Sequence, residues 1–245
     1  MAPIRIPRKR CRYMKHSLVC LPFAGGGAGF YRGWKDLPES APRIVPLQLP
    51  GREEQFIEEP FRDAVDAAEA LAPRVAELTG GGPVSLFGHS LGAVLAYELA
   101  RRLEGDSGVE LHRLFVSGSP GPWTGRSRRA TGLDDDAFLL RVQEFAGYQH
   151  DALDDPDMRE LLLPVLRTDV EMHENYKPVS DQPLRIPITS LRGASDELVS
   201  REQAAEWRTA TSADFELVEI PGMHMYLVES PLPLVEAVVR ALPAE

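Results

Sequence analysis

Hydrophobic residues along this chain fall into two kinds of segment that alternate with each other. Short runs rich in Val, Ile and Leu, mostly without polar alternation, are typical of strands buried on both faces of a sheet. We expect six such strands, at Ser17–Phe23, Arg43–Leu49, Val84–Phe87, Leu111–Ser117, Ile186–Arg192 and Phe215–Ile220. Longer helical patterns separate them, which is typical of repeated strand-helix units.

In the segments between the strands, apolar residues recur every three or four positions. This spacing is the period of a helix with one buried side. The clearest example is the alanine-rich segment Phe61–Leu78. We expect further helices at Ala93–Leu103, Arg201–Thr209 and Leu232–Leu242. The alternation predicts an α/β fold in which helices flank a mostly parallel central sheet.

The segment from residue 125 to about 181 interrupts this alternation, because it contains two helical patterns and no strand-like run. The first pattern includes Phe138 and Phe145. The second follows the capping pair Asp155-Pro156 and contains Pro164, which is expected to kink it. Two interpretations remain open, a pair of core helices or a helical lid that roofs a cavity. We favour the lid, because the segment leaves the sheet close to the candidate nucleophile described below.

Length and composition fit a single domain. The chain has 245 residues, of which 43% are hydrophobic, enough for a sizeable core. Residues 1–16 hold six basic residues and no acidic one, so we expect a flexible basic arm before one domain at 17–245. The net charge of −10 disfavours nucleic-acid binding, because such a surface repels phosphates.

The sequence predicts neither a membrane span nor a secretion signal. No apolar run approaches the roughly 18 residues that span a bilayer, and no hydrophobic stretch follows the basic start. The two cysteines, Cys11 and Cys20, form no disulfide framework and lack the spacing of metal ligands. These observations favour a reducing cytoplasm, with no membrane partner and no bound metal.

The strongest chemical motif is Gly88-His89-Ser90-Leu91-Gly92, which follows the apolar run 83–87 and begins a helical pattern. A strand, a sharp turn and a helix are the context of a nucleophile elbow, in which Ser90 is the nucleophile. Glycines two positions before and after the serine remove Cβ atoms that would crowd the turn. The alternative is a chance match in a chain with 20 glycines, and the flanking patterns disfavour it.

A serine nucleophile needs a base within hydrogen-bond reach and an acid that orients the base. On sheets of this type the order along the chain is serine, acid, histidine. We choose His224, because it follows the last expected strand at the edge where ligands gather. His173, in the second lid helix, is expected to be structural or to line the cavity. Packing or surface roles are expected for His89, His112 and His150.

Asp196 is the candidate acid, because it follows the expected strand Ile186–Arg192 directly. Some hydrolases place the acid one strand earlier, but residues 119–129 contain no Asp or Glu. Glu197 is the alternative acid. An aspartate in a turn is also common for structural reasons alone, yet the position of Asp196 between Ser90 and His224 favours catalysis.

The oxyanion of the reaction also needs two backbone N–H donors. Leu91, the residue after the nucleophile, is expected to supply one. The loop Pro22-Phe-Ala-Gly-Gly-Gly27 is expected to supply the other through Ala24, since its glycines allow the backbone to approach a substrate. A phosphate-binding loop is the alternative, but the segment lacks both the G-x-G-x-x-G spacing and a Lys-Ser/Thr ending.

Five phrases of the chain carry a resemblance to a known family. They are Pro22-Phe-Ala-Gly-Gly, Leu49-Pro-Gly-Arg52-Glu-Glu, Gly88-His-Ser-Leu-Gly-Ala93, Leu163-Pro-Val-Leu-Arg-Thr-Asp169 and Pro221-Gly-Met-His224. From about Leu18 to the C-terminus the chain resembles the stand-alone type II thioesterases of polyketide and non-ribosomal peptide synthesis. The resemblance implies an α/β-hydrolase fold and an editing enzyme without a cofactor of its own. Such an enzyme removes stalled or mis-primed acyl groups from the phosphopantetheine arm of acyl or peptidyl carrier proteins.

Two positions depart from the pattern of that family. The family often has a second glycine before the histidine, where this chain has Met223. We expect this change to alter how water reaches the acyl-enzyme. The family also often has a Gly-Gly-x-Pro-like phrase in the lid, where this chain has Ala146-Gly-Tyr-Gln-His150. We expect that change to reshape the acyl cavity.

Other functions remain open at this point. The same three residues serve a carboxylesterase or lipase equally well, and a non-catalytic ligand-binding protein of this fold is a further alternative. A domain cut from a larger synthase is disfavoured, because the chain starts at its own Met1 and has no carrier-like segment. We expect a monomer.

Carrier domains are usually acidic, as this chain is, so overall charge does not favour their docking. The local cluster Arg126, Arg128 and Arg129 is the candidate docking site for carrier acids or for the pantetheine phosphate. The alternative is that these arginines belong to a solvated loop.

Overall fold

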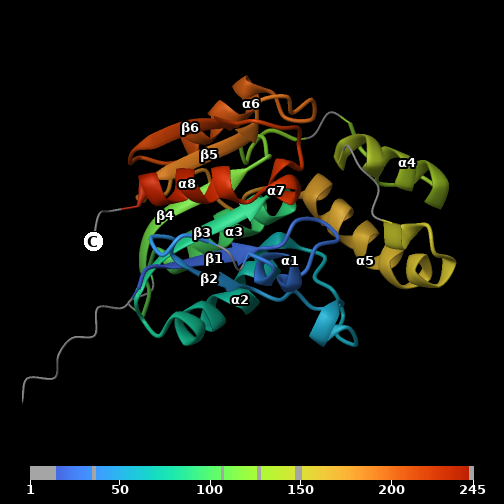
Figure 1. Ribbon diagram of the computed structural model, residues 1–245, viewed down its shortest axis with the longest axis horizontal. Coiled ribbons are helices and arrows are strands. Elements are labelled where there is room, and N and C mark those ends of the chain that lie inside the picture. Colours follow the sequence, from blue (N-terminus) through green and yellow to red (C-terminus); the bar gives the residue numbers. More distant parts are fainter. Residues whose placement is uncertain (1–14, 35–36, 106–107, 126–127, 147–150, 243–245) are drawn as a thin grey trace, which may run out of the picture.

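The six expected strands form one sheet in the computed structural model, which describes residues 15–34, 37–105, 108–125, 128–146 and 151–242. The strands are β1 (Ser17–Leu21), β2 (Arg43–Pro46), β3 (Pro83–His89), β4 (Glu110–Ser117), β5 (Ile188–Gly193) and β6 (Phe215–Ile220). They are all parallel and lie in the order β2-β1-β3-β4-β5-β6 (Figure 1). The predicted α/β class with a mostly parallel sheet is confirmed.

The ends of the strands differ from the predicted ranges by a few residues. β1 ends at Leu21 rather than Phe23, and β2 ends at Pro46 rather than Leu49. Pro22 has no N–H to donate, so the ladder between β1 and its neighbours ends there. The residues beyond these two ends therefore form loops at the carboxyl edge of the sheet, where a substrate can approach them.

Helices cover both faces of the sheet (Figure 1). Val19 and Leu21 of β1 join the core beneath α2 (Ala64–Thr79) and α3 (Leu91–Leu103). Their neighbours Leu18 and Cys20 join a second core on the opposite face. That core is covered by α1 (Ala28–Arg32), α7 (Tyr226–Glu229) and α8 (Leu232–Ala241). Side chains that alternate between two buried faces explain why β1 is apolar at four consecutive positions, Leu18–Leu21.

Capping residues determine where two of the helices begin. The Asp63 side chain accepts hydrogen bonds from the backbone N–H groups of Val65 and Asp66, so α2 begins at Ala64 rather than at the predicted Phe61. Ser200 and Gln203 form a capping box at the start of α6 (Arg201–Ala205). The chain then tightens into the 3-10 helix η3 (Glu206–Ala210), where one continuous helix was predicted.

Between β4 and β5 the chain forms α4 (Asp135–Ala146), the 3-10 helix η2 (Asp151–Leu153) and α5 (Pro156–Asn175). These elements extend beyond the carboxyl edge of the sheet (Figure 1). α5 begins after its cap Asp155 and continues through Pro164. Apolar residues of α4 and α5, including Phe138, Leu163 and Leu166, form a third hydrophobic cluster separate from the two beside the sheet.

Among the described helices, none combines the length and apolar character that a bilayer crossing requires. The predicted basic arm at 1–16 lies almost wholly outside the described residues, which begin at Lys15. Cys20 is buried in β1, and Cys11 is not among the described residues.

Trp207 of η3 is fully buried against α3 and beside the loop after β4. Its ring lies edge-on to Tyr97, and its indole N–H donates to the carbonyl oxygen of Ser119 over 3.0 Å.

Replacing Trp207 by alanine is expected to lower the free energy of unfolding by about 3–5 kcal/mol, because a large cavity is left. Denaturant unfolding measures this loss. The matched variant Trp123→Ala, at a half-exposed tryptophan, is expected to lose far less; equal losses would contradict the core role of Trp207.

Candidate active site

Ser90 occupies the turn between β3 and α3. Its backbone has φ 55° and ψ −117°, a conformation that costs energy for a residue with a side chain. The backbone around it is held on both sides. The N–H of Ser90 donates to Ser117 of the neighbouring strand β4 over 2.7 Å, and its carbonyl accepts from Ala93 in the first turn of α3 over 3.0 Å.

The two glycines that flank Ser90 are required by close backbone contacts. A Cβ atom at Gly88 would overlap the carbonyl oxygen of Gly92. A Cβ atom at Gly92 would lie 2.8 Å from the carbonyl oxygen of Pro22, which follows β1. Strand, turn and helix therefore approach one another as the motif predicts, and Ser90 lies at the carboxyl edge of the sheet.

His224 and Asp196 form a buried hydrogen-bonded pair at the same edge. Asp196 follows β5, His224 follows β6, and these two strands are neighbours. Nδ1 of His224 and Oδ2 of Asp196 are 2.8 Å apart. The other carboxylate oxygen of Asp196 accepts from the backbone N–H groups of Leu198, over 2.8 Å, and Val199, over 3.0 Å. The carboxylate is thus fixed in direction by three donors.

The surroundings of Asp196 favour its ionised form. Burial alone raises the pKa of Asp196, but the hydrogen bond and charge of His224 and the N–H groups of Val199 and Leu198 outweigh burial. The net pKa of Asp196 lies below its ordinary value of 3.8. The alternative acid, Glu197, is exposed.

Ser90 and His224 line one cavity of about 430 Å³. Ala24 lines it as well, and Leu91 begins the helix that follows Ser90. α4 and α5 supply apolar walls, made of Leu139, Val142, Phe145, Leu161, Leu162, Val165 and Leu166. The candidate nucleophile and base therefore line the same largely apolar cavity.

The glycine-rich loop after β1 contacts α5 closely. Gly25 has φ +74°, and a Cβ atom there would lie 3.0 Å from Leu166. The sequence predicts that the glycines of this loop allow a close approach to substrate. Gly25 does line the cavity, but its lack of a side chain also admits the α5 side chain.

The remaining histidines lie in three different environments. His89 is fully buried, with its ring centroid 4.8 Å from that of His224 and its Nδ1 2.8 Å from the Ser117 hydroxyl oxygen. His112 is half-buried, 3.0 Å from the Glu110 carboxylate. His173 lines the cavity, which was one of the two roles predicted for it. His150 lies outside the described residues.

Sequence reasoning assigned no individual role to two buried charged residues near the site, Arg52 and Asp169. They form a bidentate ion pair with distances of 2.6 and 2.8 Å. Their only signal in the sequence is that both lie in phrases that carry the family resemblance, since 117 positions separate them along the chain. Among the described residues, no group of three or more His, Cys, Asp or Glu side chains is arranged to hold a metal ion.

A serine on a strained elbow, with a His–Asp pair on loops of the same sheet edge, is the arrangement typical of the α/β-hydrolase class. Comparison with known proteins supports this assignment. A family model described as "Thioesterase domain" matches residues 16–245. The chain belongs to the thioesterase family, and it is a hydrolase of the kind that acts on thioesters. The predicted resemblance to thioesterases is confirmed.

Individual relatives match over most of their length. Gramicidin S biosynthesis protein GrsT of Aneurinibacillus migulanus is 32% identical, over 93% of this chain and 89% of its own. Thioesterase PikA5 of Streptomyces venezuelae is 34% identical, over 86% of this chain and 75% of its own.

Solved structures of thioesterases also superimpose closely on the chain. The RedJ thioesterase from the prodiginine biosynthetic pathway in Streptomyces coelicolor has a TM-score of 0.83 at 32% identity, over 98% of this chain and 91% of its own. YbtT, a type II thioesterase from the yersiniabactin NRPS/PKS pathway, has a TM-score of 0.83 at 29% identity, over 95% and 94%. These matches confirm the predicted α/β-hydrolase fold.

The lowered pKa of Asp196 predicts a pH dependence of stability. A carboxylate with a lowered folded pKa stabilises the folded state above the unfolded pKa, and the contribution is lost as the pH falls through the folded pKa. Replacing Asp196 by asparagine removes this titration. The difference in unfolding free energy between wild type and Asp196→Asn is therefore expected to shrink below about pH 4, as followed by urea unfolding. A difference that stayed constant across the acidic range would contradict the lowered pKa.

Proposed function

We propose that this protein is a type II, editing thioesterase. It hydrolyses acyl thioesters on the phosphopantetheine arm of acyl or peptidyl carrier proteins that serve polyketide or non-ribosomal peptide synthesis. The observation that carries the proposal is that Ser90 and His224 line one largely apolar cavity, with His224 hydrogen-bonded to Asp196. The relatives include biosynthetic thioesterases, which supports the choice of substrate.

The proposed reaction begins with proton transfer from the Ser90 hydroxyl to His224 as the serine oxygen attacks the thioester carbonyl. Asp196 holds Nδ1 of His224, which leaves Nε2 to act as the base. The N–H groups of Ala24 and Leu91 bind the oxyanion that forms. When the tetrahedral intermediate collapses, the C–S bond breaks and His224 returns the proton to the leaving thiol.

The second half of the reaction repeats these steps with water. His224 takes a proton from water as the water oxygen attacks the acyl-serine carbonyl. Collapse of the second intermediate breaks the ester bond, releases the carboxylic acid and returns the proton to Ser90. The scheme uses only groups of this chain and water, so it needs no metal or organic cofactor. The phosphopantetheine arm stays attached to the carrier protein and now ends in a free thiol.

Intact-mass analysis of an acylated carrier protein tests the proposed function. Wild type is expected to remove the acyl group and to leave the phosphopantetheine in place, while Ser90→Ala is expected to leave the acylated arm unchanged. An acyl carrier that persists while a simple oxoester is cleaved would identify an esterase instead. Failure of both reactions, together with no labelling of Ser90 by a fluorophosphonate, would identify a non-catalytic protein.

Two matched variants, measured in the same experiment, distinguish between the candidate acids Asp196 and Glu197. Asp196→Asn is expected to lower kcat by about 10⁴-fold, because the histidine loses the partner that fixes its tautomer. Glu197→Gln changes the neighbouring exposed carboxylate by the same chemical step and is expected to leave kcat close to that of wild type. The reverse order of effects would transfer the role to Glu197.

Carrier docking is the second part of the proposal. Of the predicted cluster, Arg126 lies outside the described residues, and Arg129 binds Glu174 and Asn175 of α5. Arg128 is half-exposed, pairs with Glu144 over 2.6 Å, and lines a small cleft together with Met223 and His224. Of these three residues, we therefore assign docking of an acidic carrier surface or of the pantetheine phosphate to Arg128.

Charge reversal at Arg128 tests this assignment. Arg128→Glu is expected to lower kcat/KM for a carrier-bound thioester by on the order of fivefold, because a charge at the rim of an interface mainly affects encounter. The rate on an acyl thioester of N-acetylcysteamine, which has no carrier, is expected to stay the same. Arg240→Glu, on the exposed side of α8, is the control for net charge. Equal effects on both substrates would contradict docking at Arg128.

A further inference from the structure

A buried ion pair joins two distant parts of the chain beside the active site. Arg52, in the loop after β2, is 7% exposed, and Asp169, in α5, is completely buried. Nη1 of Arg52 lies 2.6 Å from Oδ2 of Asp169, and Nη2 lies 2.8 Å from Oδ1. This fork geometry fixes both side chains in one plane.

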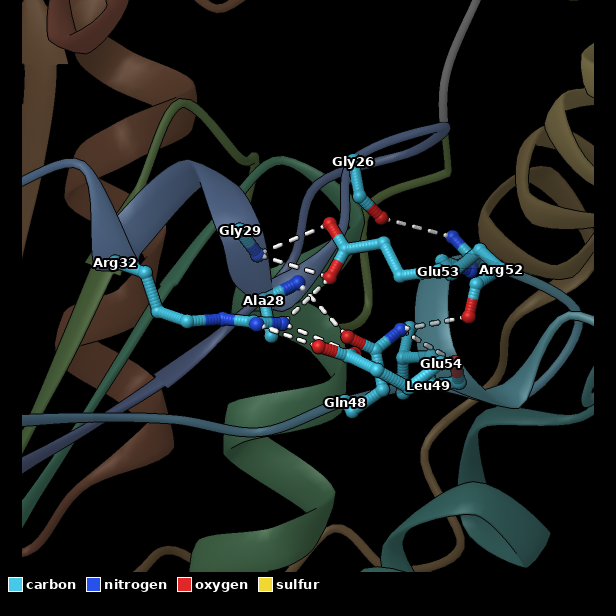
Figure 2. A network of polar contacts seen from close by, with 9 residues as sticks. All are labelled: Gly26, Ala28, Gly29, Arg32, Gln48, Leu49, Arg52, Glu53 and Glu54. Carbon is cyan, nitrogen blue, oxygen red and sulfur yellow. Dashed lines mark hydrogen bonds and ion pairs between the residues drawn. The ribbon is translucent and has the colours of Figure 1, made fainter.

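Both partners of the pair also bind the glycine-rich loop after β1. The Asp169 carboxylate accepts from the backbone N–H of Gly25 over 2.8 Å. The Arg52 guanidinium donates to the carbonyl oxygen of Gly26 over 3.0 Å (Figure 2). The ion pair therefore binds the N–H of Gly25 through its carboxylate and the carbonyl of Gly26 through its guanidinium.

These two contacts restrain the peptide that carries the proposed oxyanion donor. The carbonyl of Phe23 accepts from the N–H of Gly26 over 2.9 Å, which closes a turn over residues 23–26. In a trans peptide the N–H points opposite to the carbonyl, so the N–H of Ala24 points away from the inside of this turn. Ala24 lines the cavity. Holding Gly25 and Gly26 thus holds the direction of the Ala24 N–H.

The loop that carries Arg52 is itself anchored. The Gln48 side chain donates to the carbonyl oxygens of Leu49, over 2.9 Å, and Arg52, over 3.2 Å, and accepts from the N–H of Ala28 over 3.3 Å. Glu53 accepts from the N–H of Gly29 and pairs with Arg32 (Figure 2). Arg52 therefore extends from a rigid base, whereas Asp169 depends on the position of α5.

Stability does not by itself explain a pair of this kind. Two buried charges lose their hydration, and replacing both by apolar residues of similar volume is often neutral or stabilising. What apolar residues cannot do is donate to Gly26 and accept from Gly25. The specific contribution of the pair is therefore to orient the loop backbone.

We propose that Arg52 and Asp169 are positioning residues that orient the Ala24 N–H toward the oxyanion. The proposal rests on the proposed function, because Ala24 has a role only if Ser90 forms a tetrahedral intermediate. Since Asp169 belongs to α5, a displacement of this helix would release the N–H of Gly25. The oxyanion site is then complete only while α5 lies against the loop, which couples the apolar roof of the cavity to the chemical step.

Two variants separate orientation from stability. Asp169→Asn keeps the shape of the side chain but removes its charge, and the double variant Arg52→Met/Asp169→Leu removes both charges together. We expect kcat for an acyl thioester of N-acetylcysteamine to fall about 10- to 100-fold in each, because the donor is misplaced rather than deleted. KM is expected to change little. The double variant is expected to fold, because it leaves no unpaired buried charge.

A transition-state analogue gives a readout that a merely structural role would not change. An alkyl trifluoromethyl ketone forms a tetrahedral adduct with the nucleophilic serine, so its affinity is expected to fall by the same factor as kcat. The affinity of the matching methyl ketone, which binds mainly as a ground-state ligand, is expected to stay close to that of wild type.

The control variant is Tyr176→Phe, which removes a partly buried polar contact of the residue that follows α5. The hydroxyl of Tyr176 donates to Glu98 of α3 over 2.5 Å, away from the glycine-rich loop. This variant is expected to lose stability and to keep kcat. All rates are expressed per active site, counted from the end point of fluorophosphonate labelling, so that partial unfolding does not lower kcat.

The outcomes distinguish this proposal from the proposed function. If wild type hydrolyses the thioester and both Arg52/Asp169 variants keep the wild-type kcat per labelled site, the positioning role is wrong and the proposed function stands. The same holds if every loss of rate follows the loss of folded protein. If wild type neither hydrolyses the thioester nor is labelled at Ser90, the proposed function itself fails.

Discussion

The strained backbone of Ser90 is the constraint on which the rest of the site depends. A residue with a side chain adopts φ 55° only if its surroundings hold it there. The sheet supplies this hold through the hydrogen bond from Ser90 to Ser117, and α3 supplies it through the bond from Ala93. Gly88 and Gly92 let strand, turn and helix approach closely enough for both bonds to form. The buried core on both faces of the sheet therefore stabilises a geometry that is unfavourable locally.

The parallel sheet brings the other chemical groups to the same edge. Because all six strands run in one direction, the loops after β3, β5 and β6 leave from one side and carry Ser90, Asp196 and His224. Neighbouring positions of β5 and β6 in the sheet bring the His–Asp pair together. The elements between β4 and β5 extend beyond this edge (Figure 1) and line an apolar cavity together with loops of the sheet. The His–Asp pair and most of the apolar cavity wall thus come from different segments of the chain.

The charged groups around the glycine-rich loop connect these two segments. Asp169 is a buried residue of α5, the helix that supplies part of the cavity wall, and Arg52 lies on a loop that follows a strand of the sheet. Their shared contacts with Gly25 and Gly26 make the loop conformation depend on both. Because α5 both lines the cavity and binds the glycine-rich loop, a shift of this helix on substrate binding would also change the orientation of the loop. Apolar packing alone gives no such directional link, because it does not distinguish one backbone orientation from another.

Local patterns were sufficient for the class of fold, and they placed Ser90, Asp196 and His224 in loops at the same edge of the sheet. The period of the apolar positions indicated strands and helices, and the elbow motif has a steric reason that lies within five residues. The short helices α1 and α7 were missed, because they are stabilised by tertiary packing rather than by a sequence pattern long enough to detect. The pairing of Arg52 with Asp169 was also missed, since only the folded chain brings together two residues so far apart in sequence. The sequence by itself determined which groups are available and at which edge of the sheet they lie. Only the tertiary structure decided which of them touch, because contacts between distant residues depend on how helices pack and on which charges are buried together.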